Sequence, residues 1–383
     1  MKRPRLVIAI VTVTVLLVVF ATMRKSDDDS LTVAQVTDHS ATAQPQPGTL
    51  ATAPPTDLAE TAPEQGSTAL ITRCNFVALD ALSTPDAQAA LRESVTAVLT
   101  KSGDPYALAT ASMIWMGVGV DPAERLVRLE SAIDSAPNDP MLRFLAYDLC
   151  RSRSEAGANR ACDDSRSRRK LLDWLERDAG NASAWATLAI REFEVDAQAA
   201  GIAALSKAAS SASATHYLLD TVERLETALF DAGAPYPTSA VWAFGIAAAT
   251  QGSAGLYQYC RDNAPTNAVL RQHCFGYYEV LANNSNTMLG QAVGLRLQIE
   301  LIGDDPLRSK QRADLIELRS SIDERNKVLN AEISEQERWI SGDRSRFYAY
   351  INKWRATDEL TAAEFSRRER QRHEANFNCT FVD

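Results

Sequence analysis

The sequence has few of the residues from which metal sites and active sites are usually built. It contains four histidines in 383 residues: His39, His216, His273 and His373. No two of these histidines have the spacing that would place two metal ligands on one face of a helix. The six cysteines include no C-x₂₋₄-C half-site of the kind that holds zinc. We therefore predict no bound metal and no cofactor.

Motifs for covalent or redox catalysis are incomplete. Gly252-Ser-Ala-Gly255 lacks the spacing of a serine nucleophile elbow. Gly117-Val-Gly119 lacks the third glycine and the preceding strand of a dinucleotide-binding loop. His273 precedes Cys274, but we expect that cysteine in a disulfide, which removes the thiolate a nucleophile needs. The sequence thus predicts no catalytic or cofactor-binding residue.

A basic face and a β-type composition are also missing. The net charge is −9, with acidic and basic residues intermixed, which argues against a nucleic-acid partner. The most basic run, Arg367–Arg372, is interrupted by Glu369 and is predicted to be a solvated helical face. Aromatic residues make up 7% of the chain and alanine is frequent, which disfavours a β-sandwich or barrel. The composition therefore predicts an all-α fold.

One long hydrophobic run is present, at residues 6–22. It carries no charge and is long enough to cross a bilayer as a helix. Lys2, Arg3 and Arg5 precede it, so the positive-inside rule keeps the N-terminus in the cytoplasm. We predict that residues 1–25 are a single-pass signal anchor in the cell inner membrane, with the bulk of the chain periplasmic or otherwise extracytoplasmic. The alternative is a cleaved signal peptide, which exports the same residues.

Residues 26–68 form a second compositional segment. They contain five prolines among Ala, Thr, Gln, Ser and Asp, and no aromatic residue occurs between Phe20 and Phe76. Such a segment buries too little apolar surface to offset the entropy cost of ordering it. We predict a disordered linker that tethers the rest of the chain to the membrane.

All six cysteines follow the hydrophobic run: Cys74, Cys150, Cys162, Cys260, Cys274 and Cys379. An even number in an exported domain predicts disulfides, whereas six buried free thiols would fit a cytosolic protein. Pairing Cys150 with Cys162, and Cys260 with Cys274, would each close a short loop between two helices. Cys74 and Cys379 would then pair near the two ends of the folded region.

Residues 69–383 are predicted to be an all-helical domain with internal repeats. Three units line up, opening at Asp104, Asn138 and Asn181. The separation between Leu142 and Trp185, both on first helices, is one repeat period. The same separation occurs between Leu129 and Leu172 on second helices.

The hydrophobic pattern of these units resembles that of the tetratricopeptide (TPR) family. The residues that carry the resemblance are Trp185, Leu188 and Ala189 on a first helix, and Leu129, Ala132 and Pro137 on a second. The resemblance covers about residues 104–214 and implies stacked antiparallel helical hairpins, a TPR-like α-solenoid. Gly180 stands where the family has a closing proline, and the second unit is longer than the family's, so the repeats are degenerate.

The last part of the chain, about residues 307–375, is predicted to supply closing helices. Residues 307–341 read as one long amphipathic helix, with Leu315, Ile322 and Leu329 every seven residues. A helix packed on the domain is preferred over a coiled-coil dimer because the pattern spans too few heptads. The tryptophans are predicted to anchor hairpin packing.

Stacked hairpins present extended surfaces that commonly serve recognition. We therefore expect a membrane-tethered extracytoplasmic scaffold or adaptor that binds proteins or peptides. The alternative is a helical cell-envelope enzyme acting on cell-wall or lipid-linked material in a groove. An acidic pair, or a carboxyl with a strongly raised pKa, in the largest groove would favour the enzyme. A groove lined only by Asn, Arg and aromatic residues would favour binding.

The predicted anchor can be tested by fractionation. The intact chain should stay with the membrane pellet after a salt wash and dissolve only in detergent, because residues 6–22 remain attached. A soluble mature form that starts near residue 24 would show instead that the segment is removed.

Overall fold

The computed structural model describes residues 85–114, 121–151, 162–250, 254–331, 336, 339–340 and 342–377. These residues form fifteen α-helices packed against one another and no β-strand, which confirms the all-α prediction. None of the helices described is long and apolar enough to span a membrane. The predicted anchor, the linker, Cys74 and Cys379 lie outside the described residues.

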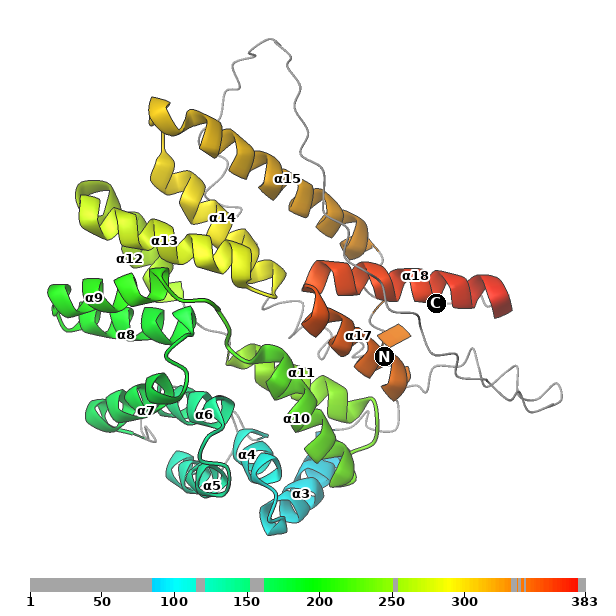
Figure 1. Ribbon diagram of the computed structural model, residues 1–383. Helices are drawn as coiled ribbons and strands as arrows, with labels where there is room; N and C mark the ends of the chain where they lie inside the picture. Colours follow the sequence, from blue (N-terminus) through cyan, green and yellow to red (C-terminus); the bar gives the residue numbers. More distant parts are fainter. Residues whose placement is uncertain are drawn as a thin grey trace, which may run out of the picture. The chain divides into compact units, whose positions relative to one another are not determined.

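The helices are labelled in Figure 1. Their bounds are α3 Pro85–Lys101, α4 Pro105–Met113, α5 Pro122–Ser135, α6 Pro140–Arg151, α7 Asp164–Arg177, α8 Ala182–Glu194, α9 Gln198–Ala209, α10 Leu218–Asp231, α11 Thr238–Ala249, α12 Ala254–Asn263, α13 Ala268–Asn284, α14 Met288–Ile302, α15 Ser309–Ala331, α17 Arg344–Ala356 and α18 Glu359–Phe377. Two 3₁₀ turns, Ala264–Thr266 and Pro306–Arg308, precede α13 and α15.

The segment predicted to be repetitive forms consecutive packed pairs. Helix α4 packs on α5, α6 on α7 and α8 on α9, and α5 and α7 also contact the helix that follows (Figure 1). Polar side chains cap the first helix of each pair. At the start of α6, Asp139 accepts from the backbone N–H of Met141 at 2.8 Å. Asp104 accepts from the backbone N–H groups of Tyr106 and Ala107, and Asn181 accepts from that of Ser183.

The predicted repeat register is only partly correct. Leu129 and Leu142 are fully buried, in agreement with the prediction. Leu172, predicted as the equivalent of Leu129, is 39% exposed, whereas its neighbour Leu171 is completely buried. Two adjacent leucines on a helix point about 100° apart, so the pattern alone did not decide which of them faces the core.

The chain leaves this row of helix pairs after α9. Helix α10 packs against α3, α4 and α17. The crossover, residues 210–217, is held on the turn between α7 and α8 by the buried side chain of Asn181. Its Oδ1 accepts from Thr215 N at 3.1 Å, and its Nδ2 donates to Thr215 O at 2.9 Å. Asn181 thereby pairs with both backbone groups of the crossover residue.

Tyr217 completes this connection. Its φ of 55° lies in the left-handed region, which a tyrosine rarely adopts. The Tyr217 hydroxyl donates to Asp178 and accepts from Trp174 Nε1 at 2.8 Å. Its ring lies 5.6 Å from that of Phe144. These contacts hold the unusual backbone geometry and direct the chain into α10.

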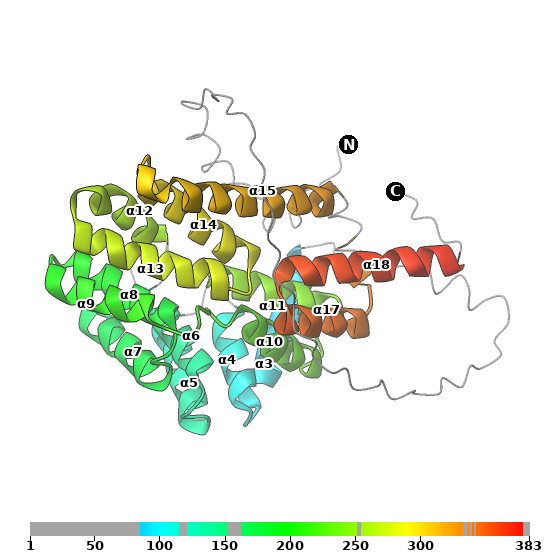
Figure 2. The same ribbon diagram turned by 45° about the horizontal axis from the view of Figure 1, so that its top comes forward.

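The later helices extend from the α8–α9 pair and include both locally predicted disulfides. Helix α12 packs on α8, α13 on α9, α14 on α13 and α15 on α14 (Figure 2). Cys260 and Cys274 are bonded across α12 and α13, and Cys150 and Cys162 across the connection between α6 and α7. Both predicted local pairings are therefore confirmed.

The closing region is made of separate helices. Helix α15 ends at Ala331, before the predicted end near residue 341. The heptad residues Leu315, Ile322 and Leu329 are part-buried or buried, and α15 packs on α14 and α18. The predicted packed closing helix is thus observed.

The basic run of α18 differs from its prediction. We expected a solvated helical face, but Arg370 is buried beside Glu374.

The Asn181 connection predicts a specific loss of stability. Asn181→Ala would leave both backbone groups of Thr215 without partners, so we expect a cost of about 2–4 kcal/mol in unfolding free energy. Asn267 caps α13 from an exposed position and makes no such crossover contact. Asn267→Ala should cost only about 1 kcal/mol. Denaturant unfolding of both variants measures the difference, and equal losses would contradict this role of Asn181.

Candidate functional site

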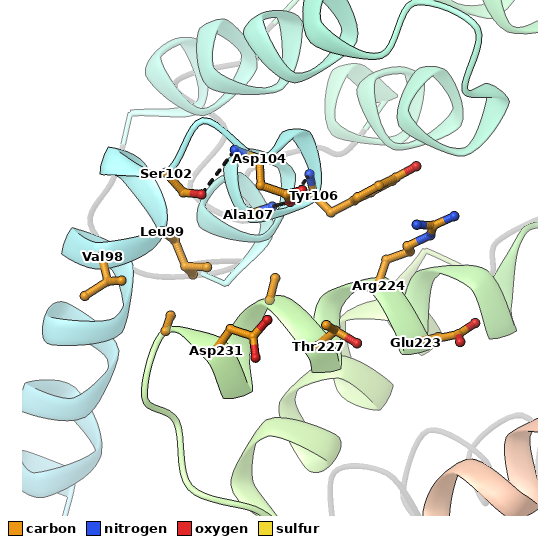
Figure 3. A pocket seen from close by; sticks show the side chains of 12 residues that line it. Val98, Leu99, Ser102, Asp104, Tyr106, Ala107, Glu223, Arg224, Thr227 and Asp231 are labelled. Carbon is orange, nitrogen blue, oxygen red and sulfur yellow. Dashed lines mark hydrogen bonds between the residues drawn. The ribbon is translucent and has the colours of Figure 1, made fainter.

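The candidate site is a cleft of about 480 Å³ between the α3–α4 connection and α10. Its lining residues are Val98, Leu99, Ser102, Asp104, Tyr106, Ala107, Glu223, Arg224, Thr227, Ala228, Asp231 and Ala232. Figure 3 shows Ser102, Asp104 and Tyr106 on one side, and Arg224, Thr227 and Asp231 on α10 opposite them. The cleft exists because the crossover brings α10 beside helices that lie far from it in sequence.

The wall formed by α4 is built around its N-terminus. Asp104 Oδ1 accepts from Tyr106 N at 2.9 Å and from Ala107 N at 2.8 Å. The Tyr106 hydroxyl donates to Asp139 Oδ2 at 2.7 Å. Burial and this carboxylate together raise the pKa of Tyr106 to about 12. Tyr106 is therefore a neutral hydrogen-bond donor and cannot serve as a base near neutral pH.

The wall formed by α10 carries mixed charge. The Arg224 guanidinium lies 4.2 Å from the centre of the Tyr106 ring, a cation–π contact that links the two walls. Glu223 pairs with Arg355 of α17 at 2.5 Å. Asp231 is the last residue of α10, where the helix dipole disfavours a negative charge. A carboxylate in that position is stabilised when a cation binds beside it.

The floor of the cleft is apolar. Leu99, Ala107 and Ala228 are buried there, and Val98 at the rim is about half exposed. Small alanine side chains on both walls leave the space open. The cleft therefore combines an apolar floor with charged groups at its edges, as binding pockets commonly do.

A buried ion pair fixes α10 from its other side. Glu226 is fully buried and accepts from Arg344 Nη2 at 3.0 Å, from Ser239 Oγ at 2.9 Å and from the Tyr348 hydroxyl at 2.5 Å. The Arg344 guanidinium also lies 3.9 Å from the centre of the Phe230 ring. Tyr348 is hydrogen-bonded to Thr227, which lines the cleft. These contacts hold α10, α11 and α17 together and make one cleft wall rigid.

The three histidines in the described part of the chain lie in separate surroundings, and His39 lies outside the described residues. His216 packs against Phe144, and burial beside Arg151 lowers its pKa to about 4. His373 contacts the ring of Trp339, and His273 lies on α13 beside the bonded Cys274. The residues that the structure describes contain no group of three or more His, Cys, Asp and Glu that could hold a metal.

The five tryptophans among the described residues pack in or on the core, as predicted, and Trp115 lies outside those residues. Trp174, Trp339 and Trp354 are buried, and Trp185 packs on the core. The guanidinium of Arg92 lies over Trp242, 5.4 Å from the centre of the Trp242 ring. None of the five lines the cleft.

Two carboxyl groups with raised pKa lie outside the cleft. Burial raises the pKa of Asp148, which pairs with Arg151 at 2.8 Å. Burial also raises the pKa of Glu359 to about 7, helped by the nearby Asp358 and opposed by a 2.7 Å hydrogen bond from Met288 N. Glu359 begins α18 and caps α14, so it joins two helices that are distant in sequence.

The polar side chains of the cleft are mostly engaged in local hydrogen bonds. None of its twelve described lining residues is histidine or cysteine, so the usual partners for activating a nucleophile are not among them. The Ser102 hydroxyl accepts from Asp104 N at 3.1 Å, and the Thr227 hydroxyl bonds Tyr348. Sequence reasoning missed this site because its two walls are brought together only by the crossover.

Comparison with known proteins identifies no relative. No protein-family model, curated protein or solved structure matches the chain.

The Glu359 contact predicts a dependence of stability on pH. Because its folded pKa is raised from 4.5 to about 7, its contribution is complete below pH 4.5 and is lost as the pH rises through 7. Glu359→Gln imitates the protonated form and should be more stable than the parent by about 1–3 kcal/mol at pH 8, with little difference at pH 4.5.

Urea unfolding of the two proteins across that pH range measures the effect. Glu317→Gln, on the exposed side of α15, serves as the control and should follow the parent. Parallel pH profiles for the parent and Glu359→Gln would show that Glu359 does not titrate in this window.

Proposed function

We propose that this chain is a membrane-tethered extracytoplasmic scaffold that binds a protein or peptide partner in the cleft between α3–α4 and α10. The observation that carries the proposal is the cleft itself, with one wall held by the Glu226–Arg344 ion pair, an apolar floor and charged edges. In this proposal residues 6–22 anchor the chain in the inner membrane with the N-terminus in the cytoplasm. Residues 26–68 form the tether that lets the helical domain search the space beyond the membrane.

The bonded cysteines support the proposed location. Disulfides persist in oxidising compartments such as the periplasm and are rare in the cytosol. Cys150–Cys162 and Cys260–Cys274 are both bonded. They favour an extracytoplasmic domain, which is also the topology that the charges flanking residues 6–22 predict.

We further propose that residues 104–214 are a degenerate TPR-like array. Helices α4 to α9 form successive packed pairs, which is compatible with such an array. After Ser213 the chain turns back onto α3 and α4. The proposed binding site therefore lies where the array is closed by α10, and differs from the open surface expected of a longer solenoid.

The enzyme alternative has one observation in its favour, because Asp104 and Asp231 both line the cleft. However, the carboxyls with raised pKa, Asp148 and Glu359, lie outside the cleft, and one oxygen of Asp104 is used to cap α4. The cleft also contains Arg224 and Tyr106, and these two residue types are enriched in protein–protein interfaces. Binding is therefore the better-supported function.

Site-specific photo-cross-linking in cells that produce the full chain tests the proposal. A photo-reactive residue at Val98, on the cleft rim, should give a discrete adduct with one partner. The same residue at Val269, which is similarly exposed on α13, should not. Ala232→Phe fills the cleft and should reduce the Val98 adduct about tenfold or more.

Ala249→Phe, at an exposed position of α11, provides the matched control and should leave the adduct unchanged. The binding function would be contradicted if Val98 and Val269 gave the same adducts, or if Ala232→Phe had no effect.

A further inference from the structure

We propose that the partner inserts a lysine or arginine side chain into the cleft, with its cationic head between Asp104 and Asp231. This inference rests on the proposed function and specifies the chemistry of the partner. Its basis is the distribution of charge and apolar surface over the two walls.

The lining has a net negative charge. It contains three acids, Asp104, Glu223 and Asp231, and one base, Arg224, giving 1 − 3 = −2. Arg224 is directed to the Tyr106 ring, and Glu223 is paired with Arg355 outside the cleft. The carboxylates left for a ligand are therefore those of Asp104 and Asp231.

Asp104 and Asp231 approach the cleft from opposite walls. Figure 3 shows Asp231 on α10 and Asp104 on the opposite side of the cleft. Asp104 Oδ1 receives both capping hydrogen bonds, so Oδ2 remains to accept from a ligand.

The floor fits the rest of such a side chain. Lysine and arginine bury their aliphatic stems along apolar surface while the charged head stays near polar groups. Leu99, Ala107 and Ala228 supply that surface between the acidic edges. An acidic side chain of the partner could pair with Arg224, but it would be repelled by the carboxylates of Asp104 and Asp231. Charge complementarity therefore favours a basic side chain.

Peptide titration followed by NMR tests the inference on the full chain in detergent micelles. With alanine methyl groups labelled, the signals of Ala107, Ala228 and Ala232 report on the cleft, and those of Ala189 and Ala247 serve as distant references. The probes are acetyl-Gly-Ala-Lys-Ala-Gly-amide and the same peptide with norleucine or glutamate in place of lysine. The lysine peptide should shift the three cleft signals saturably, and the other two peptides should not.

The Asp231 carboxylate is then removed or reversed. Asp231→Lys should weaken binding of the lysine peptide about tenfold or more, and Asp231→Asn should weaken it less. Asp231 is exposed at the end of α10, so Asp231→Asn should retain the thermal stability of the parent, which shows that the fold is intact.

The inference is overturned if the norleucine peptide binds as well as the lysine peptide, if the glutamate peptide binds in its place, or if Asp231→Lys has no effect. Cross-linking separates this failure from that of the proposed function. If the Val98 adduct persisted in Asp231→Lys, the proposed scaffold function would stand, and insertion of a cationic side chain into the cleft would be ruled out.

Discussion

The hydrogen bonds of Asn181 to the backbone of Thr215 determine how the second half of the domain is placed. They fasten the crossover after α9 to the turn between α7 and α8, and a main-chain bond from Ala182 N to Ser213 O at 2.7 Å strengthens the same contact. A fully buried amide that satisfies both backbone groups of another residue cannot be replaced by water. The direction of the chain into α10 depends on this contact.

Two further part-buried polar contacts set the position of the remaining helices. Glu226 and Arg344 connect α10 to α17, and Glu359 connects α18 to the start of α14. Breaking a buried ion pair by removing one partner leaves an uncompensated charge, which is costly. Helices α17 and α18 therefore contact α10 and α14, respectively. The contact with α17 lies on the side of α10 that faces away from the cleft and stabilises that cleft wall. A rigid wall reduces the entropy that a partner would lose on binding.

The elements that the sequence predicted well are those governed by local chemistry. Asp104 and Asn181 are N-caps in the structure because their side chains accept from backbone groups two or three residues away. The cysteine pairs 150–162 and 260–274 are bonded because each closes a short connection between adjacent helices. The prediction that Leu172 faces the core was wrong because Leu171, which is buried, is equally apolar. Hydrophobic periodicity alone cannot decide which of two adjacent leucines faces the core.

The sequence by itself therefore determined the helical class, the helix starts, the short disulfides and the lack of a recognisable catalytic motif, since all of these depend on residues close together in the chain. Only the tertiary structure decided that α10 returns to α3 and α4. That return depends on a buried polar cluster formed by Asn181, Asp178 and Tyr217. Asn and Asp side chains are usually exposed to solvent, so the sequence pattern does not predict that these two meet in the interior. The cleft, and with it the opposed carboxylates of Asp104 and Asp231, follows from that long-range contact.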